Sequence, residues 1–456
     1  MAKVINFGEN ISRINLFSPH HDKELYWNIF LESNLGQIYQ SIPWNSLVPL
    51  FSTRKDKRGR KGFFGTQGKL ALMFLKSYSK SSDEKLIERL NTDYSFQFFC
   101  GIYLMPGQKI TDVKLPSKIR CELAGKLDIQ SCQKALATHW KPWLEHTSVI
   151  LEDATCYETD MRFPTDVKLL WECNEWVYGQ IKLLCKYNKM RRPRSKYDQQ
   201  KQKYLNYQRS RKKTHKKTVR RVKSLLYLLE KQLGQLTGLE VQAKEAGCDL
   251  PLRYYKRTGT IRKILGQQQE MFETRKSVPD RIVSIAKDYI RPIVRGKETK
   301  QVEFGPKVNM VQVDGINFID YLSFDAFNEC KRFIPSVRLC TELFGKTTHA
   351  AADAIYATNE NRKYCTLNNI TTSFKRKGKA GKHEQQRQKI QKILSTERAT
   401  RMEGSFGTEK SHYSLDRIKA RIKPTEILWV FFGVHTANAK RVATKRQEKL
   451  SRQQAA

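Results

Sequence analysis

The sequence predicts an α/β protein. One mixed central sheet, flanked by helices, is joined to an N-terminal all-helical domain and an inserted long helical hairpin. Two observations predict the sheet: residues 148–157 form a short apolar run ending in acidic and polar residues, and strand signals return after residue 300. A third predicts the hairpin, because a basic tract is followed by leucines at steps of three and four. A chain of 456 residues is also too long to fold around a single hydrophobic core, so we expect two or three domains.

Residues 1–140 are predicted to form the helical N-terminal domain. Apolar residues in 67–90 lie close to helical spacing, and Ser81 followed three positions later by Glu84 resembles a helix start. A basic, glycine-bearing loop at 54–62 precedes them. Alone it could be an ordinary solvated loop, but in so basic a protein we expect it to contact phosphates through Arg58, Arg60 and Lys61.

Residues 171–299 are predicted to be a basic, coiled-coil-like insertion. Its most basic tract runs from about 186 to 223 and contains Arg211, Lys212 and Lys213. The leucine stripe that follows is more often packed core than a membrane-binding or partner-binding face, so we expect two long antiparallel helices. The stripe consists of Val219, Val222, Leu226, Leu229, Leu233 and Leu236.

The segments 146–170 and 300–443 are predicted to build the sheet domain. Two β-rich runs joined by Asp314-Gly315 indicate a hairpin. The remaining predicted elements are a helix at 324–343, a short strand ending at Asp353, a strand near 371–374, and helices near 397–420 and 425–443. Residues 444–456 are basic and are expected to form a loose tail.

The charge of the chain indicates a polyanionic partner. There are 84 Lys and Arg residues against 45 Asp and Glu residues, a net charge of +39, and the pI is near 9.8. Nucleic acid fits best, because basic side chains gain affinity by releasing the counterions condensed on phosphates. An anionic membrane surface is the competing interpretation, but no apolar run is long enough to span a bilayer.

The ten cysteines are scattered without a C-x-x-C pair, so zinc-ligand spacing is absent. The first residues lack the apolar core of a signal peptide. We therefore expect reduced cysteines in an intracellular, cytoplasmic protein.

Three acids are candidates for phosphodiester chemistry. Asp153 and Asp353 end predicted strands, and Glu403 lies on a predicted helix with Lys410 two turns later on nearly the same face. Two short Asp side chains and one longer Glu could hold the pair of divalent metals that cleaves a phosphodiester. Each acid alone is more often a turn, cap or surface ion-pair residue, and spacing does not overturn that.

Four blocks strengthen this interpretation: 58–101, 149–170, 352–361 and 401–410. They include Val149-Ile-Leu-Glu-Asp153, then Asp353 followed by Tyr356 and Asn361, and Arg401-Met-Glu403-Gly-Ser-Phe-Gly-Thr-Glu-Lys410. In this order they resemble the transposases of the bacterial IS4/IS5 type, a branch of the DDE recombinases with a ribonuclease-H-like catalytic fold.

The resemblance implies cut-and-paste DNA transposition, with Asp153, Asp353 and Glu403 as the catalytic, metal-binding acids. It implies Mg²⁺, with Mn²⁺ as a substitute, terminal inverted repeats and target DNA as substrates, and a homodimer that holds two element ends. Lys410 is the expected phosphate-binding residue.

The chain departs from the family signature at two positions. The Tyr and Arg of that signature fall at Thr396 and Ala399. Arg398 and Arg401 stand nearby and are candidates to take over the phosphate contact. A non-catalytic or decayed nucleic-acid-binding protein, and a nuclease without strand transfer, remain as alternatives.

Overall fold

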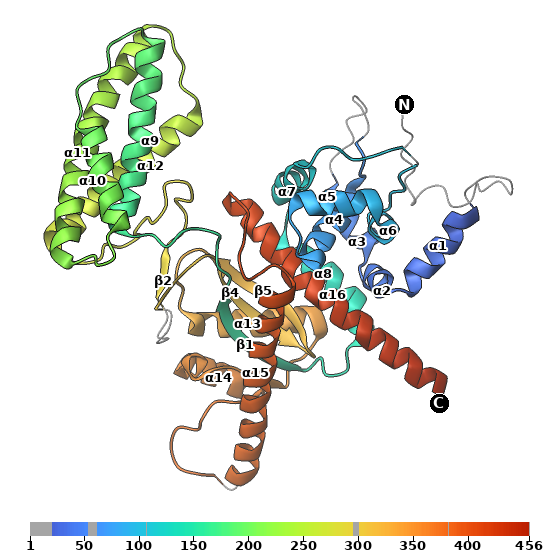
Figure 1. The fold of residues 1–456 in the computed structure, drawn as a ribbon. Coiled ribbons are helices and arrows are strands. Elements are labelled where there is room, and N and C mark those ends of the chain that lie inside the picture. The colour runs from blue at the N-terminus through green and yellow to red at the C-terminus, as the bar shows by residue number, and fades with distance from the viewer. Residues whose placement is uncertain (1–20, 53–61, 106, 295–300, 382, 456) are drawn as a thin grey trace. The chain divides into compact units, whose positions relative to one another are not determined.

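A computed structural model describes residues 21–52, 62–105, 107–294, 301–381 and 383–455 (Figure 1). The protein is mixed α/β and 62% helical. It divides into two compact units: a core unit, formed by 1–160 with 305–456, and an inserted unit, 161–304. Each unit is described by itself.

The N-terminal part of the core unit is all helical in the described residues. The predicted helical stretch 67–90 is two helices, because Lys80 adopts a left-handed conformation (φ 53°) that ends the first. Ser82, not Ser81, caps the second: its hydroxyl accepts a hydrogen bond from the Lys85 amide. The helices are α1 (His21–Glu32), α2 (Asn34–Gln40), α3 (Trp44–Phe51), α4 (Thr66–Ser79), α5 (Asp83–Thr92), α6 (Tyr94–Phe99), α7 (Leu115–Ala124), α8 (Ile129–Trp140) and the short η1 (Lys141–Trp143).

The core unit contains a five-stranded mixed sheet in the order β5-β4-β1-β6-β7. Central β1 pairs antiparallel with β4 and parallel with β6; β4 and β5 are antiparallel, and β6 and β7 are parallel. The predicted hairpin is confirmed: Val313 pairs with Ile316, and Asp314 and Gly315 both have positive φ, as a type I′ turn requires. The strands are β1 (Val149–Cys156), β4 (Lys307–Val313), β5 (Ile316–Ser323), β6 (His349–Ala351) and β7 (Thr371–Thr372).

The N-terminal helices pack against this sheet and its last helix. Gln133 of α8 covers the edge strand β5: its amide donates to the Ile319 carbonyl at 2.9 Å and accepts from the Ile319 amide at 2.6 Å. Phe74 of α4 meets Phe432 of α16 (Lys423–Ala455) edge to face, with ring centroids 4.9 Å apart. These contacts tie segments from both ends of the sequence into one unit.

Two of the later helices cover opposite faces of the sheet. The neighbours Glu152 and Asp153 on β1 point to opposite sides, the first to Ser336 of α13 and the second to Arg398 of α15. The remaining elements are η2 (Glu329–Arg332), α13 (Phe333–Phe344), η3 (Ala354–Tyr356), α14 (Asn359–Leu367) and α15 (Glu384–His412).

Three predicted boundaries are wrong. The helix expected from 324 begins at Phe333, after the η2 turn, and α15 begins at Glu384 rather than near 397. No loose tail starts at 444, because α16 continues to Ala455. Its last turns are anchored to the N-terminal helices, since Arg446 donates to the side-chain oxygens of Gln37 and Gln40.

In its described residues, 161–294 and 301–304, the inserted unit is a bundle of four helices rather than the predicted two-helix hairpin (Figure 1). The leucine stripe on α11 is wider than a two-helix seam, because Leu225 and Leu228 are buried beside the predicted positions. That stripe packs against both α9 and α12. The elements are α9 (Asp166–Tyr187), α10 (Tyr197–Arg209), α11 (His215–Glu245), α12 (Leu252–Thr274), and a small sheet of β2 (Pro292–Val294) and β3 (Val302–Phe304).

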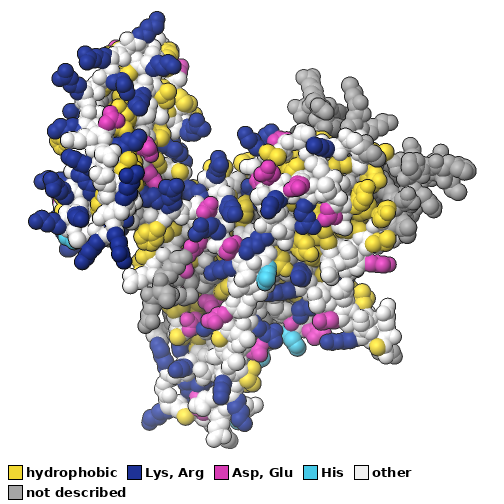
Figure 2. Space-filling model, in the orientation of Figure 1, with side chains coloured by type: hydrophobic (Ala, Val, Ile, Leu, Met, Phe, Trp, Pro, Cys, Tyr) yellow, Lys and Arg dark blue, Asp and Glu magenta, His cyan; other side chains and the backbone are white. Residues whose placement is uncertain are grey.

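The inserted unit carries much of the positive charge. Its 35 Lys and Arg residues against 14 Asp and Glu residues give +21 of the total +39. Figure 2 shows Lys and Arg side chains spread over the visible face of the bundle. In the part of the chain that the structure describes, no helix is both long and apolar enough to cross a membrane.

Candidate active site

The register of two parallel strands brings Asp153 and Asp353 together. Leu151 of β1 pairs with Ala351 of β6, so both aspartates lie two residues beyond the last pair. Side chains two residues apart along a strand share a face, so the strands direct the two acids to the same side of the sheet. The Asp353 carboxylate also caps the η3 turn by accepting from the Ala354 amide at 2.7 Å.

One guanidinium joins the two carboxylates. Arg398 of α15 places one terminal nitrogen 2.9 Å from Asp153 Oδ2 and the other 3.3 Å from Asp353 Oδ1. Burial raises the pKa of Asp153, and the charge of Arg398 opposes that rise. The Asp353 side chain is 56% exposed, so this centre opens to solvent on the Asp353 side.

The structure does not add Glu403 to this pair. The residue is exposed on α15. Among the described residues, the Glu403 carboxylate has no hydrogen-bond or ion-pair partner. Within the same part of the chain, no group of three or more His, Cys, Asp or Glu residues is arranged to hold a metal ion.

Lys410 lies beside the strand that carries Asp153. Its ammonium donates to the Thr155 hydroxyl at 3.1 Å and sits 5.8 Å from the centre of the Tyr157 ring. Glu403 and Lys410 are seven residues apart and therefore lie on nearly the same side of α15. Arg401 instead pairs with Glu397 one turn earlier on the helix. Of the predicted phosphate-binding residues on α15, Arg398 and Lys410 face the sheet.

Buried polar contacts fix the position of α15 on the sheet. Glu409 is fully buried and accepts hydrogen bonds from the Tyr157 hydroxyl and the Asn317 amide. Ser405, one turn earlier, accepts from the same Asn317 amide at 2.6 Å. These contacts determine which residues of α15 face β1.

A buried network lies on the other face of β1, and sequence reasoning missed it. The Glu152 carboxylate accepts from Asn309 at 2.9 Å and from Ser336 at 2.8 Å. Burial raises the pKa of Glu152 to about 8, against these hydrogen bonds, so the group is largely protonated at neutral pH. The Tyr356 hydroxyl donates to Asn309 at 2.7 Å, and Asn361 donates to the Tyr356 carbonyl at 2.8 Å.

This network gives the Tyr and Asn that follow Asp353 a structural role. They anchor the η3 turn, which Asp353 caps, to β4 and α14. The signal in the sequence was an acid at Glu152 within an otherwise apolar run, one residue before Asp153.

The predicted DNA-binding residues of the inserted unit are exposed. Arg211, Lys212 and Lys213 lie in the connection between α10 and α11, and Lys213 sits 5.8 Å from the centre of the Tyr207 ring. Arg58, Arg60 and Lys61 lie outside the described residues.

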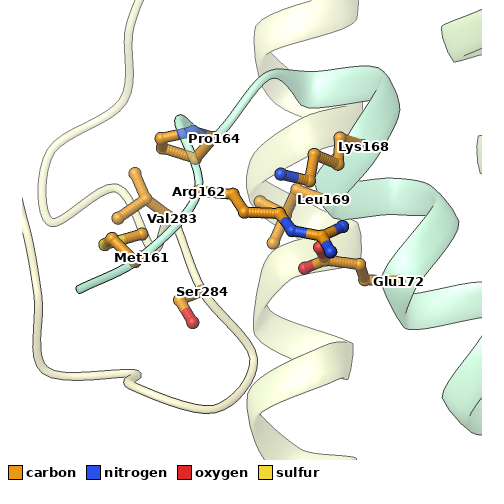
Figure 3. A pocket seen from close by; sticks show the side chains of 8 residues that line it. All are labelled: Met161, Arg162, Pro164, Lys168, Leu169, Glu172, Val283 and Ser284. Atoms are coloured by element: carbon orange, nitrogen blue, oxygen red, sulfur yellow. The ribbon is translucent and has the colours of Figure 1, made fainter. Parts of the chain in front are cut away.

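A shallow pocket of about 130 Å³ lies where α9 begins, and no candidate catalytic acid lines it. Figure 3 shows the Arg162 and Glu172 side chains directed toward each other, with Lys168 beside them. Burial lowers the pKa of Lys168 and raises that of Glu172. Because none of the candidate catalytic acids lines it, we assign the pocket no catalytic role.

Comparison with known families gives two matches. Residues 350–430, which include Asp353, Glu403 and Lys410, match the family described as Transposase DDE domain. Residues 26–120, which cover most of the N-terminal helices, match Transposase domain (DUF772). No curated protein and no solved structure matches the chain. Both matches are to transposase domains, one of them of the DDE type, and together they support an insertion-sequence DDE transposase.

Proposed function

We propose that the chain catalyses cut-and-paste transposition of an insertion sequence. It hydrolyses the phosphodiester at each element end and transfers the freed 3′ ends to target DNA. The observation that carries this proposal is that Asp153 and Asp353 both contact the guanidinium of Arg398. Arg398 lies on α15, the helix that also bears Glu403. The mixed sheet, antiparallel on one side of β1 and parallel on the other, supports a ribonuclease-H-like catalytic domain of the IS4/IS5 type.

The residues at the centre suit a divalent metal. DDE transposases generally use divalent metal ions, and carboxylate oxygens are the ligands that Mg²⁺ prefers. Asp153, Asp353 and Glu403 would hold Mg²⁺, or Mn²⁺ in its place. When bound, the metals would supply an activated water and shelter the charge that develops on the phosphate. Glu403 is available for this role, since no partner among the described residues occupies its carboxylate.

The basic residues have separate proposed tasks. Lys410 and Arg398 neutralise charge at the scissile phosphate, next to the strand that bears Asp153. Other phosphates of the duplex are bound by Arg401 and, in the inserted unit, by Arg211, Lys212 and Lys213. Because two element ends are cut and joined together, we propose a homodimer in the complex with DNA.

A non-catalytic or decayed DNA-binding transposase is the second candidate. The position of Glu403, exposed and outside the Asp153–Asp353 pair, favours it. Metal dependence separates the two candidates, because a binder should hold DNA equally well in EDTA and never cut it.

Cleavage of duplex DNA that carries the inverted repeats flanking the gene tests the proposal. Asp153→Asn, Asp353→Asn and Glu403→Gln should each lower the Mg²⁺-dependent cleavage rate by roughly a hundredfold or more, because several kcal/mol of charge stabilisation is lost. Asp416→Asn, which removes an exposed acid 3.8 Å from Lys80, is the matched control. Full activity in any of the three variants removes that residue from the site, and wild-type protein that never cuts favours the binder.

A further inference from the structure

Arg398 lies where a shared metal ion would be expected. Its two terminal nitrogens contact one carboxylate each, and its side chain is only 17% exposed. Both oxygens of Asp153 are engaged, Oδ2 by Arg398 and Oδ1 by the Ala154 amide at 2.8 Å. A cation that binds both aspartates must therefore compete with the guanidinium for Asp153 Oδ2.

The contacts of the Arg398 guanidinium with the two aspartates leave part of its hydrogen-bonding capacity unused. Among the described residues, the buried Nε–H of Arg398 has no hydrogen-bond partner, so this position does not satisfy all of its donors. The 3.3 Å contact is made to the more exposed aspartate. A guanidinium fork matches a phosphate as well as it matches a carboxylate, so a DNA phosphate offers an equivalent partner.

We propose that Arg398 is an internal counter-cation that excludes metal ions from Asp153 and Asp353 until DNA binds. In the DNA-free protein it bridges the two acids; a phosphate at the site draws it away and frees the carboxylates for metal. The inference rests on the proposed function. It makes metal binding and DNA binding mutually favourable, each strengthening the other by the same factor.

A titration of the full chain with Mn²⁺ tests this inference without measuring activity. The EPR signal of free Mn²⁺ disappears as the ion binds, so its loss reports the affinity. Without DNA, Arg398→Gln should bind Mn²⁺ about tenfold more tightly than wild type, within the usual range of coupling between sites. Arg417→Gln is the matched control, because it breaks another Arg–Asp pair, to Asp160 at 3.5 Å, and should leave the affinity unchanged.

Removing one positive charge could by itself raise the Mn²⁺ affinity. The effect of DNA on that affinity distinguishes this general effect from competition between Arg398 and Mn²⁺ for the two aspartates. A short duplex should raise the Mn²⁺ affinity of wild type by a similar factor and leave that of Arg398→Gln nearly unchanged, after subtraction of Mn²⁺ bound by the duplex alone. Arg398→Lys keeps the charge but has one nitrogen in place of the fork, so its affinity should fall between the two. If Arg398→Gln fails to fold, the Lys variant decides.

The outcomes are distinguishable. Equal Mn²⁺ affinity in wild type and Arg398→Gln, or an equal gain with DNA in both, overturns the role of Arg398 and leaves the metal site intact. If no protein binds Mn²⁺ even with DNA, the proposed function fails and this inference fails with it.

Discussion

At the scale of single residues, Glu152 makes the stability of the protein depend on pH. Its pKa lies at about 8 in the folded protein, against an ordinary value of 4.5. Between these values the folded state binds more protons than the unfolded state, so the free energy of unfolding falls as the pH rises. Each unit of pKa difference corresponds to about 1.4 kcal/mol.

Glu152→Gln should remove this dependence. Relative to wild type, the variant should gain up to a few kcal/mol in free energy of unfolding between pH 5 and pH 8, because the wild-type carboxyl is forced toward ionisation in a buried site. Urea unfolding at a series of pH values measures the difference, with the exposed Asp416→Asn as control. Parallel losses in wild type and Glu152→Gln would show that another group is responsible.

At the scale of elements, the last turns of α16 depend on contacts with α2. Arg446 donates to Gln37 at 3.0 Å and to Gln40 at 2.7 Å, whereas Arg452 is 73% exposed and lies 3.5 Å from Glu145. Arg446→Ala should speed amide hydrogen exchange beyond residue 445 by roughly tenfold or more, since a hydrogen bond from a charged donor contributes about 1.5–3 kcal/mol. Arg452→Ala should change it little, and equal effects would contradict the anchoring role.

Local sequence patterns predicted the helices and strands themselves better than the elements against which they pack. Asp314-Gly315 specified the hairpin because a type I′ turn needs two positive φ angles, a purely local requirement that Asp-Gly meets. The leucine stripe predicted a long packed helix but not the four-helix bundle, because periodicity shows that a face is buried without showing how many helices cover it. The tail was mispredicted because its anchors, Gln37 and Gln40, lie about 400 residues earlier in the sequence.

The candidate site divides in the same way. The prediction that Asp353 follows a strand is confirmed, since β6 ends two residues before it. The prediction that Asp153 ends its strand is wrong, because β1 continues to Cys156 through its pairing with β4. The parallel register of β1 and β6 brings the two acids together. The contact of Arg398 with both could not be predicted, because it depends on how α15 lies across β1, which Tyr157 and Asn317 set through Glu409. Glu403 as the third acid remains a prediction.

At the scale of the whole molecule, charge is unevenly distributed. The inserted unit has under a third of the residues but +21 of the net +39. A positive surface gains DNA affinity largely by releasing counterions, so this unit should dominate the salt dependence of binding. That role requires no base recognition and is compatible with a site for cutting located in the core unit.

Replacing Arg211, Lys212 and Lys213 together with Gln should therefore flatten the salt dependence of DNA binding. Each phosphate contact adds about 0.9 to the slope of log affinity against log salt concentration, so the slope should fall by up to about 3. The matched control replaces Lys134, Lys141 and Lys346, three exposed lysines of the core unit, and should change the slope less. Titrations of fluorescent duplex at several salt concentrations measure both. If the slope falls as much or more in the control, the main phosphate contacts lie on the core unit. The positive charge of the inserted unit would then not be explained by DNA binding.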